Sequence, residues 1–180
     1  MNSENEKNIN ELELKKYEEL YSLSKQLLEN EHDRFVNVEE KTQKHFTIMV
    51  VILGFISFNI DEYILIWKNC IDFLEFIFLI ILPFIVTLIF VSLFFYIKAL
   101  SFGKYKSLTI NSEMFNHFKK NRYVDVIYSL SKRNAEDLEI NKSLTNKKLN
   151  SANTAYLLTK IVIALLPIII VLYFVIKLRS

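Results

Sequence analysis

The sequence is poor in the residues that build turns, crosslinks and metal sites. It has one cysteine, two glycines and two prolines in 180 residues. The single cysteine, Cys70, excludes an internal disulfide framework and a cysteine-based zinc site, and we expect it to be chemically inert. Because glycine and proline punctuate most turns, their scarcity predicts long helices with few connections.

Residues arranged for catalysis are equally scarce. The two glycines cannot form a glycine-rich phosphate loop, and the Gly-x-Ser-x-Gly pattern of serine hydrolases is absent. The three histidines, none of which stands at metal-ligand spacing, are His32, His45 and His117. We therefore predict a protein that is not an enzyme and that uses no cofactor or metal.

Polar and apolar residues are strongly segregated. Apolar residues make up 52% of the chain and charged residues 23%, so some stretches must be nearly free of charge while others are dense in it. The many Asn, Lys and Ile residues favour a bacterium with an AT-rich genome.

The longest uncharged run, residues 76–97, contains 22 residues. About 20 apolar residues span a bilayer core, so this run predicts a transmembrane helix. Pro83 is tolerated there because neighbouring helices can satisfy the carbonyl group that it frees.

Two shorter uncharged runs, residues 46–60 and 161–176, are predicted to span as well. Each can lengthen, because His45 can lie at the interface and Lys160 can extend its amine to the surface. The alternative is that one of them is an interfacial or core helix. The acidic N-terminus and the late start of the first run argue against a cleaved secretory signal.

Charge predicts the orientation in the membrane. Residues 98–160 contain 12 basic and five acidic residues, whereas residues 61–75 contain one basic and four acidic. The positive-inside rule then places the basic region and the N-terminus in the cytoplasm. The C-terminus falls outside, where Lys177 and Arg179 run against the rule.

We thus predict an all-α bacterial inner-membrane protein with three transmembrane helices and long cytoplasmic helical extensions. Its expected segments are an N-terminal cytoplasmic helix (1–45), a first span (46–60), a short outer connection (61–75), a second span (76–97), a basic cytoplasmic helical region (98–155) and a third span (156–178).

No helix-breaking residue separates the cytoplasmic helices from the first and third spans, in residues 39–55 and again in 148–166. Such joins can pass a movement of the extensions into the membrane. In the first extension, Tyr17, Leu20, Leu27, Phe35 and Val38 approach a heptad stripe.

In the second extension, the candidate seam between subunits contains Asn134, Leu138 and Asn141. Buried asparagines there can fix register and oligomeric state, or the same residues can face solvent. One three-helix bundle encloses little space, so a pore requires a homo-oligomer of four or more copies.

Basic residues cluster before and within the second extension. They are either an ordinary cytoplasmic surface in contact with lipid head groups or a site for nucleotide phosphates. The candidate phosphate ligands are Lys119, Lys120, Arg122, Lys132 and Arg133, and Lys147 and Lys148 add to the charge. Tyr123 and Tyr128 are candidates for stacking on a base.

Four polar residues of the spans are candidates for lining a pore; the alternative is that they bond the backbone or neighbouring helices. They are Ser57, Asn59, Thr87 and Ser92.

Two stretches, RFVNVEEKTQKHFTIMVVILGF (34–55) and LSKRNAEDLEINKSLTNKKLNSANTAYLL (130–158), resemble small multi-span transmembrane effectors of bacterial antiphage defence. The resemblance is one of layout, carried by Lys41, Thr42, Asn134, Asn141 and Lys148. It implies an effector gated by a nucleotide signal from a cognate nucleotidyltransferase or cyclase, with no long nucleic acid as partner. The alternatives are a non-channel anchor that recruits a cytoplasmic protein through its helices, and an immunity or toxin–antitoxin membrane protein that needs no nucleotide.

Overall fold

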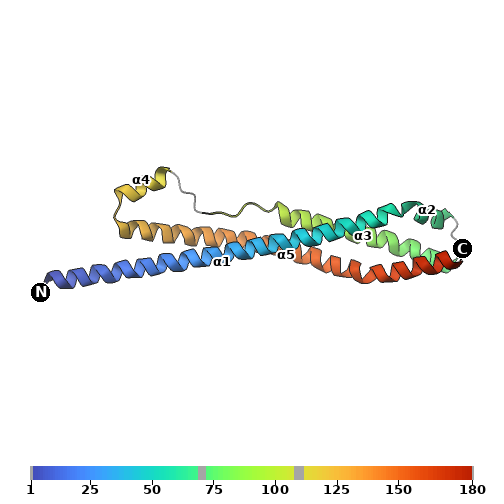
Figure 1. Cartoon of the computed structure of the whole chain (residues 1–180), viewed down its shortest axis with the longest axis horizontal. Helices are drawn as coiled ribbons and strands as arrows, with labels where there is room; N and C mark the ends of the chain where they lie inside the picture. Colours follow the sequence, from blue (N-terminus) through green and yellow to red (C-terminus); the bar gives the residue numbers. More distant parts are fainter. Residues whose placement is uncertain (1, 69–71, 108–111, 180) are drawn as a thin grey trace. The chain divides into compact units, whose positions relative to one another are not determined.

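The computed structural model describes residues 2–68, 72–107 and 112–179, so Cys70 lies outside the described residues. All regular secondary structure in these ranges is helical (Figure 1), which confirms the predicted all-α class. The helices are α1 (Asn2–Phe58), α2 (Ile60–Lys68), α3 (Phe73–Ser101), α4 (Ser112–Lys120) and α5 (Tyr123–Arg179).

Two of these helices, α3 and α5, are long and apolar enough to cross a membrane. A third candidate arises if the end of α1 and α2 are taken as one span bent by 52°. The bend falls at Asn59, which separates the two helices. The described chain therefore has two or three candidate spans, and the three uncharged runs of the sequence lie within them.

The chain folds into two compact units. The polar unit comprises Met1–Asn37 and Gly103–Asn146, and the apolar unit comprises Val38–Phe102 and Lys147–Ser180. Helices α1 and α5 contribute to both units, and neither helix is interrupted where one unit ends and the other begins. The two joins without helix breakers are thus helical throughout.

Each long helix buries one stripe of residues at intervals of three, four or seven. This spacing is a heptad repeat, whose 3.5-residue period gives a left-handed supercoil. On α1 the buried residues are Ser24, Glu31, Phe35, Val38, Thr42, Met49 and Ile56. On α5 the stripe includes Ile127, Ser131, Asn134, Leu138, Asn141, Thr145, Lys148, Ala152, Ala155, Thr159, Val162, Ile169 and Ile176.

The stripe on α1 differs from the predicted one. Phe35 and Val38 are buried as expected, but Leu20 and Leu27 remain 43% and 42% exposed. The prediction followed the apolar side chains, whereas the observed repeat runs through Ser24 and Glu31. On α5 both asparagines are buried, Asn134 at 1% and Asn141 at 0% exposure, so neither faces solvent.

The apolar unit packs α1, α3 and α5 around one hydrophobic core. Helix α3 has 29 residues, or roughly 44 Å at 1.5 Å per residue, which exceeds the roughly 30 Å bilayer core. The side chains of Met49, Ile85 and Val162, one from each helix, are fully buried. Pro83 and Pro167 lie within α3 and α5 without ending either helix.

Candidate functional site

A polar clamp in the polar unit holds the segment that follows α3. The side-chain carbonyl of Asn141 accepts from the backbone N–H of Lys106 at 2.9 Å, and its amide donates to the Lys106 carbonyl at 2.8 Å. The Tyr105 hydroxyl donates to the Leu28 carbonyl at 2.6 Å, and burial raises the pKa of this hydroxyl above its ordinary value. The clamp therefore fixes residues 105 and 106 against both α1 and α5.

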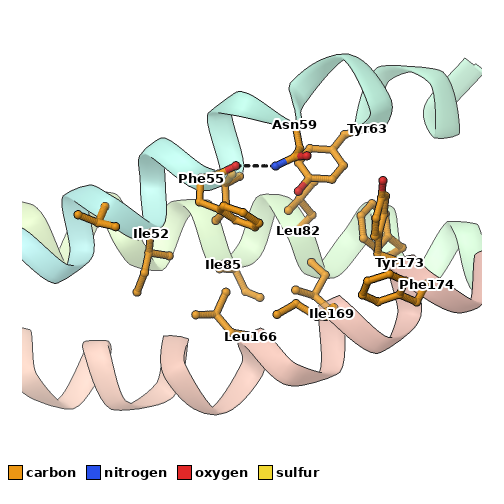
Figure 2. Close-up of a pocket in the computed structure, with 14 residues that line it drawn as sticks. Ile52, Phe55, Asn59, Tyr63, Leu82, Ile85, Leu166, Ile169, Tyr173 and Phe174 are labelled. Carbon is orange, nitrogen blue, oxygen red and sulfur yellow. Dashed lines mark hydrogen bonds between the residues drawn. The ribbon is translucent and has the colours of Figure 1, made fainter. Parts of the chain in front are cut away.

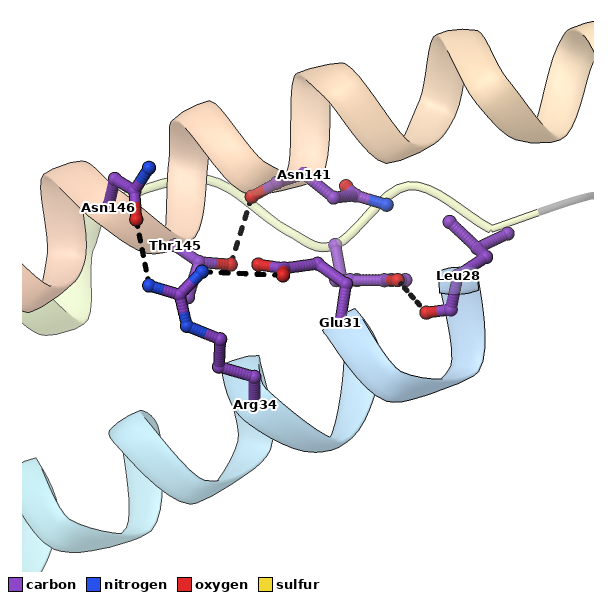
Figure 3. Close-up of polar contacts among 7 residues, drawn as sticks. Leu28, Glu31, Arg34, Asn141, Thr145 and Asn146 are labelled. Carbon is purple, nitrogen blue, oxygen red and sulfur yellow. Dashed lines mark hydrogen bonds and ion pairs between the residues drawn. The ribbon is translucent and has the colours of Figure 1, made fainter. Parts of the chain in front are cut away.

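A second set of polar contacts links the same two helices, as Figure 3 shows. The Arg34 guanidinium donates to the Asn146 side-chain oxygen at 2.8 Å and to Glu31 Oε2 at 3.4 Å. Glu31 Oε1 is buried without a hydrogen-bond partner in the described structure. On the buried stripes of the same two helices, the Asn134 amide donates to the Ser24 hydroxyl at 3.2 Å.

The apolar unit contains an ion pair between a fully buried lysine of α5 and a partly exposed glutamate of α1. The Lys148 side chain is 0% exposed, and its Nζ lies 3.2 Å from Glu39 Oε1. Sequence reasoning counted Lys148 among surface basic residues. The missed signal is its heptad position, seven residues after Asn141 and four before Ala152.

A hydroxyl network crosses from α3 to α5 deeper in the same unit. Ser92 donates to the Ala155 carbonyl at 3.1 Å, and its hydroxyl lies 3.1 Å from that of Thr159. The Tyr96 hydroxyl also lies 2.9 Å from Thr159 Oγ1. All three side chains are buried, so this network fixes the register of the two helices.

The four pore-lining candidates lie in different environments. Ser57 and Thr87 donate to carbonyls of their own helices, at Leu53 and Pro83, and Asn59 donates to the Phe55 carbonyl of α1. Ser57 and Thr87 are exposed, whereas Ser92 is buried in the hydroxyl network. The structure does not bring these four residues together.

The predicted phosphate ligands are all exposed, and they lie on α4, on α5 and in the short turn between them. Lys119, Lys120 and Arg122 lie around the junction of the two helices, which the 3.1 Å contact between His117 Nε2 and Ser129 Oγ ties together. Lys132 and Arg133 lie roughly 14 Å further along α5, at 1.5 Å per residue. Arg122 also forms an ion pair at 3.1 Å with Asp125, itself half exposed.

The side chains of the two candidate stacking residues contact α1. The Tyr128 ring meets the Tyr17 ring edge-on at 5.6 Å, and the Tyr123 hydroxyl donates to Glu18 at 3.4 Å. Their side chains are still 51% and 59% exposed. Asn134, Leu138 and Asn141 pack within one chain, so the seam between copies stays a prediction.

The described apolar unit also has a groove of about 410 Å³, shown in Figure 2. Helices α1, α3 and α5 line it with apolar side chains, together with Asn59 and Tyr63 at one end. None of the predicted phosphate ligands lies in it.

Within the described ranges, no group of three or more His, Cys, Asp or Glu residues could hold a metal ion. No protein-family model matches the chain, and the searches of curated proteins and of solved structures returned no match either.

Proposed function

We propose that the protein is a homo-oligomeric effector of bacterial antiphage defence in the inner membrane. A nucleotide signal binds its polar unit, and its apolar unit responds by opening an ion path or disrupting the membrane. The observation that carries the proposal is the continuity of α1 and α5, each of which runs without interruption from the polar into the apolar unit.

The polar residues that α1 and α5 bury against one another support a switching role for the polar unit. They include Ser24, Glu31, Asn134 and Asn141. Such residues contribute less to stability than apolar side chains and instead specify register. We propose that the helix pair has a second register of similar free energy, and that the observed polar contacts specify the resting one. A ligand selects one of them only by binding it more tightly than the other.

Exposed cations supply the proposed ligand site. Arg122 and Arg133 suit a phosphate because a guanidinium binds it through two parallel hydrogen bonds. In an oligomer each of these side chains repeats around the axis, so sites too weak in one copy combine. Tyr123 and Tyr128 retain exposed ring surface for a base.

Ion flux from liposomes that contain the purified full-length chain tests the proposal. Candidate cyclic and linear oligonucleotides are added one at a time, and we expect flux with one of them only. The double variant Arg122→Ala, Arg133→Ala should abolish the response, while Lys142→Ala, an exposed cation elsewhere on α5, should keep it. Absence of both flux and binding with every nucleotide would refute the proposal.

The second candidate is a non-channel anchor that recruits a cytoplasmic protein through its helices. The observation that favours it is a row of exposed leucines on α1, Leu20, Leu23 and Leu27, which is 42–53% exposed. The mass of the solubilised protein separates the two functions. A monomer cannot form the proposed pore, and an anchor leaves the membrane potential unchanged when it is expressed.

A further inference from the structure

The groove of the apolar unit has a more deeply buried floor and exposed walls. Leu82 and Ile85 of α3 lie at its base, where Ile85 is 0% exposed. The walls come from α1 and α5, where Phe55 and Phe174 are 66% and 58% exposed. Figure 2 shows the labelled side chains of the three helices converging on this space. The groove therefore opens sideways, between α1 and α5.

The groove is open on one side, so it is a recess in the surface of the helical bundle and not an interior void. Its volume of about 410 Å³ falls in the range of roughly 300–1,000 Å³ that is typical of ligand sites. Water is a poor occupant, because apolar cavities stay dry. For a groove that opens toward lipid, the available apolar occupant is an acyl chain.

The polar end of the groove adjoins a smaller hollow of about 190 Å³ that contains charges of both signs. Tyr173 lines both spaces, and Glu62, Glu75 and Lys177 line the smaller one. Lys177 Nζ lies 3.1 and 3.3 Å from the two Glu62 carboxylate oxygens and 3.3 Å from the Tyr173 hydroxyl. A phosphate can approach the ammonium here, and a primary amine can approach the carboxylates.

The long axis of the groove also runs in the direction that an acyl chain takes in a bilayer. From Asn59 at the polar end to Val51, the groove follows eight residues of α1, or roughly 12 Å at 1.5 Å per residue. An acyl chain anchored by its head group at the charged end would descend along the groove toward the middle of the bilayer.

We propose that this groove binds one acyl chain of a phospholipid with a primary-amine head group, such as phosphatidylethanolamine. Lys177 contacts its phosphate, and Glu62 and Glu75 contact its amine. An anionic lipid without an amine is disfavoured by the two carboxylates. The proposal depends on the apolar unit lying in a bilayer and is independent of nucleotide gating.

Lipid retention tests the proposal. The full chain is reconstituted into vesicles of equal parts phosphatidylethanolamine, phosphatidylglycerol and phosphatidylcholine, extracted in mild detergent, washed, and analysed for bound lipid by mass spectrometry. We expect phosphatidylethanolamine to be retained about tenfold more than the other two lipids. Ile170→Trp fills the groove and should lower this retention about tenfold, which is the effect of no longer burying about two methylene groups of the acyl chain.

Val171→Trp is the matched control, because Val171 is 60% exposed and does not line the groove. It should retain as much lipid as the unmodified chain. The pair Glu62→Gln, Lys177→Gln should keep bound lipid but lose the preference for the amine head group. Retained lipid with the composition of the vesicle, or equal losses in both Trp variants, would overturn the proposal.

Crosslinking provides a readout that does not depend on the Trp variants folding. Phe174→Cys is introduced in a Cys70→Ser background, since the chain has no other cysteine. With lipid in the groove, disulfide formation should fall as phosphatidylethanolamine is added. Crosslinking that is equal with and without this lipid would mean that lipid does not cover Phe174, and the lipid proposal would be wrong.

Discussion

The polar and apolar units bury the same heptad stripe of α1 and α5 but fill it with different side chains. In the polar unit the stripe contains Ser24, Glu31, Asn134 and Asn141, each held by specific hydrogen bonds. In the apolar unit, residues such as Met49 and Val162 take many of these positions, and the buried polar groups are fewer, among them Lys148 and Thr159.

The difference is the one expected of a chain whose apolar unit, with its two or three candidate spans, crosses a bilayer while its polar unit stays in water. In water a polar seam contributes little hydrophobic stabilisation, so it specifies register more than it stabilises. In a bilayer, apolar side chains gain nothing from leaving lipid, so close packing and hydrogen bonds hold the helices together. A single substitution in each unit should therefore have a different kind of effect, and four substitutions sharpen the comparison.

The largest effect is expected at the Lys148–Glu39 pair of the apolar unit. Glu39→Ala should lower the free energy of unfolding by about 3 kcal/mol, because it removes the carboxylate that lies 3.2 Å from the fully buried Lys148 ammonium. The value lies at the low end for buried pairs, since Glu39 is 35% exposed and solvent screens it. Unfolding in detergent, followed by circular dichroism, measures the change.

The double variant Glu39→Leu, Lys148→Met should recover most of this loss, because it removes both charges. The exposed pair Lys25–Glu29 provides the control: Lys25→Met should change stability by less than about 0.5 kcal/mol. If the double variant is as unstable as Glu39→Ala, the charge of Lys148 is not the cause.

The next effect concerns the clamp of the polar unit. Asn141→Leu removes both hydrogen bonds to the Lys106 backbone and should lower stability by about 1–2 kcal/mol, because Lys106 is exposed and water partly replaces the lost bonds. Amide hydrogen exchange at residues 103–107 should accelerate. Asn150→Leu, an exposed position on the same helix, should leave exchange unchanged. Equal exchange in both variants would show that Asn141 does not hold this segment.

Sequence reasoning reached the helices and the candidate spans because both depend on local composition. The uncharged run of residues 76–97 and the scarcity of glycine and proline are visible without any knowledge of packing. The buried stripe of α1 was predicted only in part. The prediction followed apolar side chains, so it selected Leu20 and Leu27 in place of Ser24 and Glu31.

The polar contacts between helices could not be predicted from local composition, because they join residues that are distant in the sequence. Asn141 and Lys106 are 35 positions apart, and Ser92 and Thr159 are 67 apart. Nothing local to Lys148 separates a buried lysine from its exposed neighbour Lys147 except the phase of the repeat. Polar residues counted at heptad positions would have identified it.

A smaller effect is expected from the hydroxyl network of the apolar unit. Thr159→Val removes a partner of the Tyr96 hydroxyl, while the Ser92 hydroxyl keeps the Ala155 carbonyl, and should lower stability by about 1 kcal/mol, within the range measured for hydrogen bonds between membrane helices. Thr87→Val is the control, since Thr87 is exposed and donates to the Pro83 carbonyl of its own helix. Thermal unfolding in detergent compares the two. A loss in Thr87→Val as large as that in Thr159→Val would mean that the network does not join α3 to α5.

The smallest effect on a single chain is expected at the exposed leucine row of α1. Leu23 is 53% exposed and lies off the buried stripe, so Leu23→Gln should change the unfolding free energy of one chain by no more than about 0.5 kcal/mol.

The effect of Leu23→Gln on assembly discriminates between the two proposed functions. If copies pack through this row, the variant lowers the oligomer mass measured by light scattering in detergent; if the row binds another protein, the mass stays the same. Leu12→Gln, at a position 69% exposed, controls for loss of an apolar side chain outside the row. A large loss of stability in a monomeric Leu23→Gln chain would instead place Leu23 in the intrachain seam and contradict the heptad register described here.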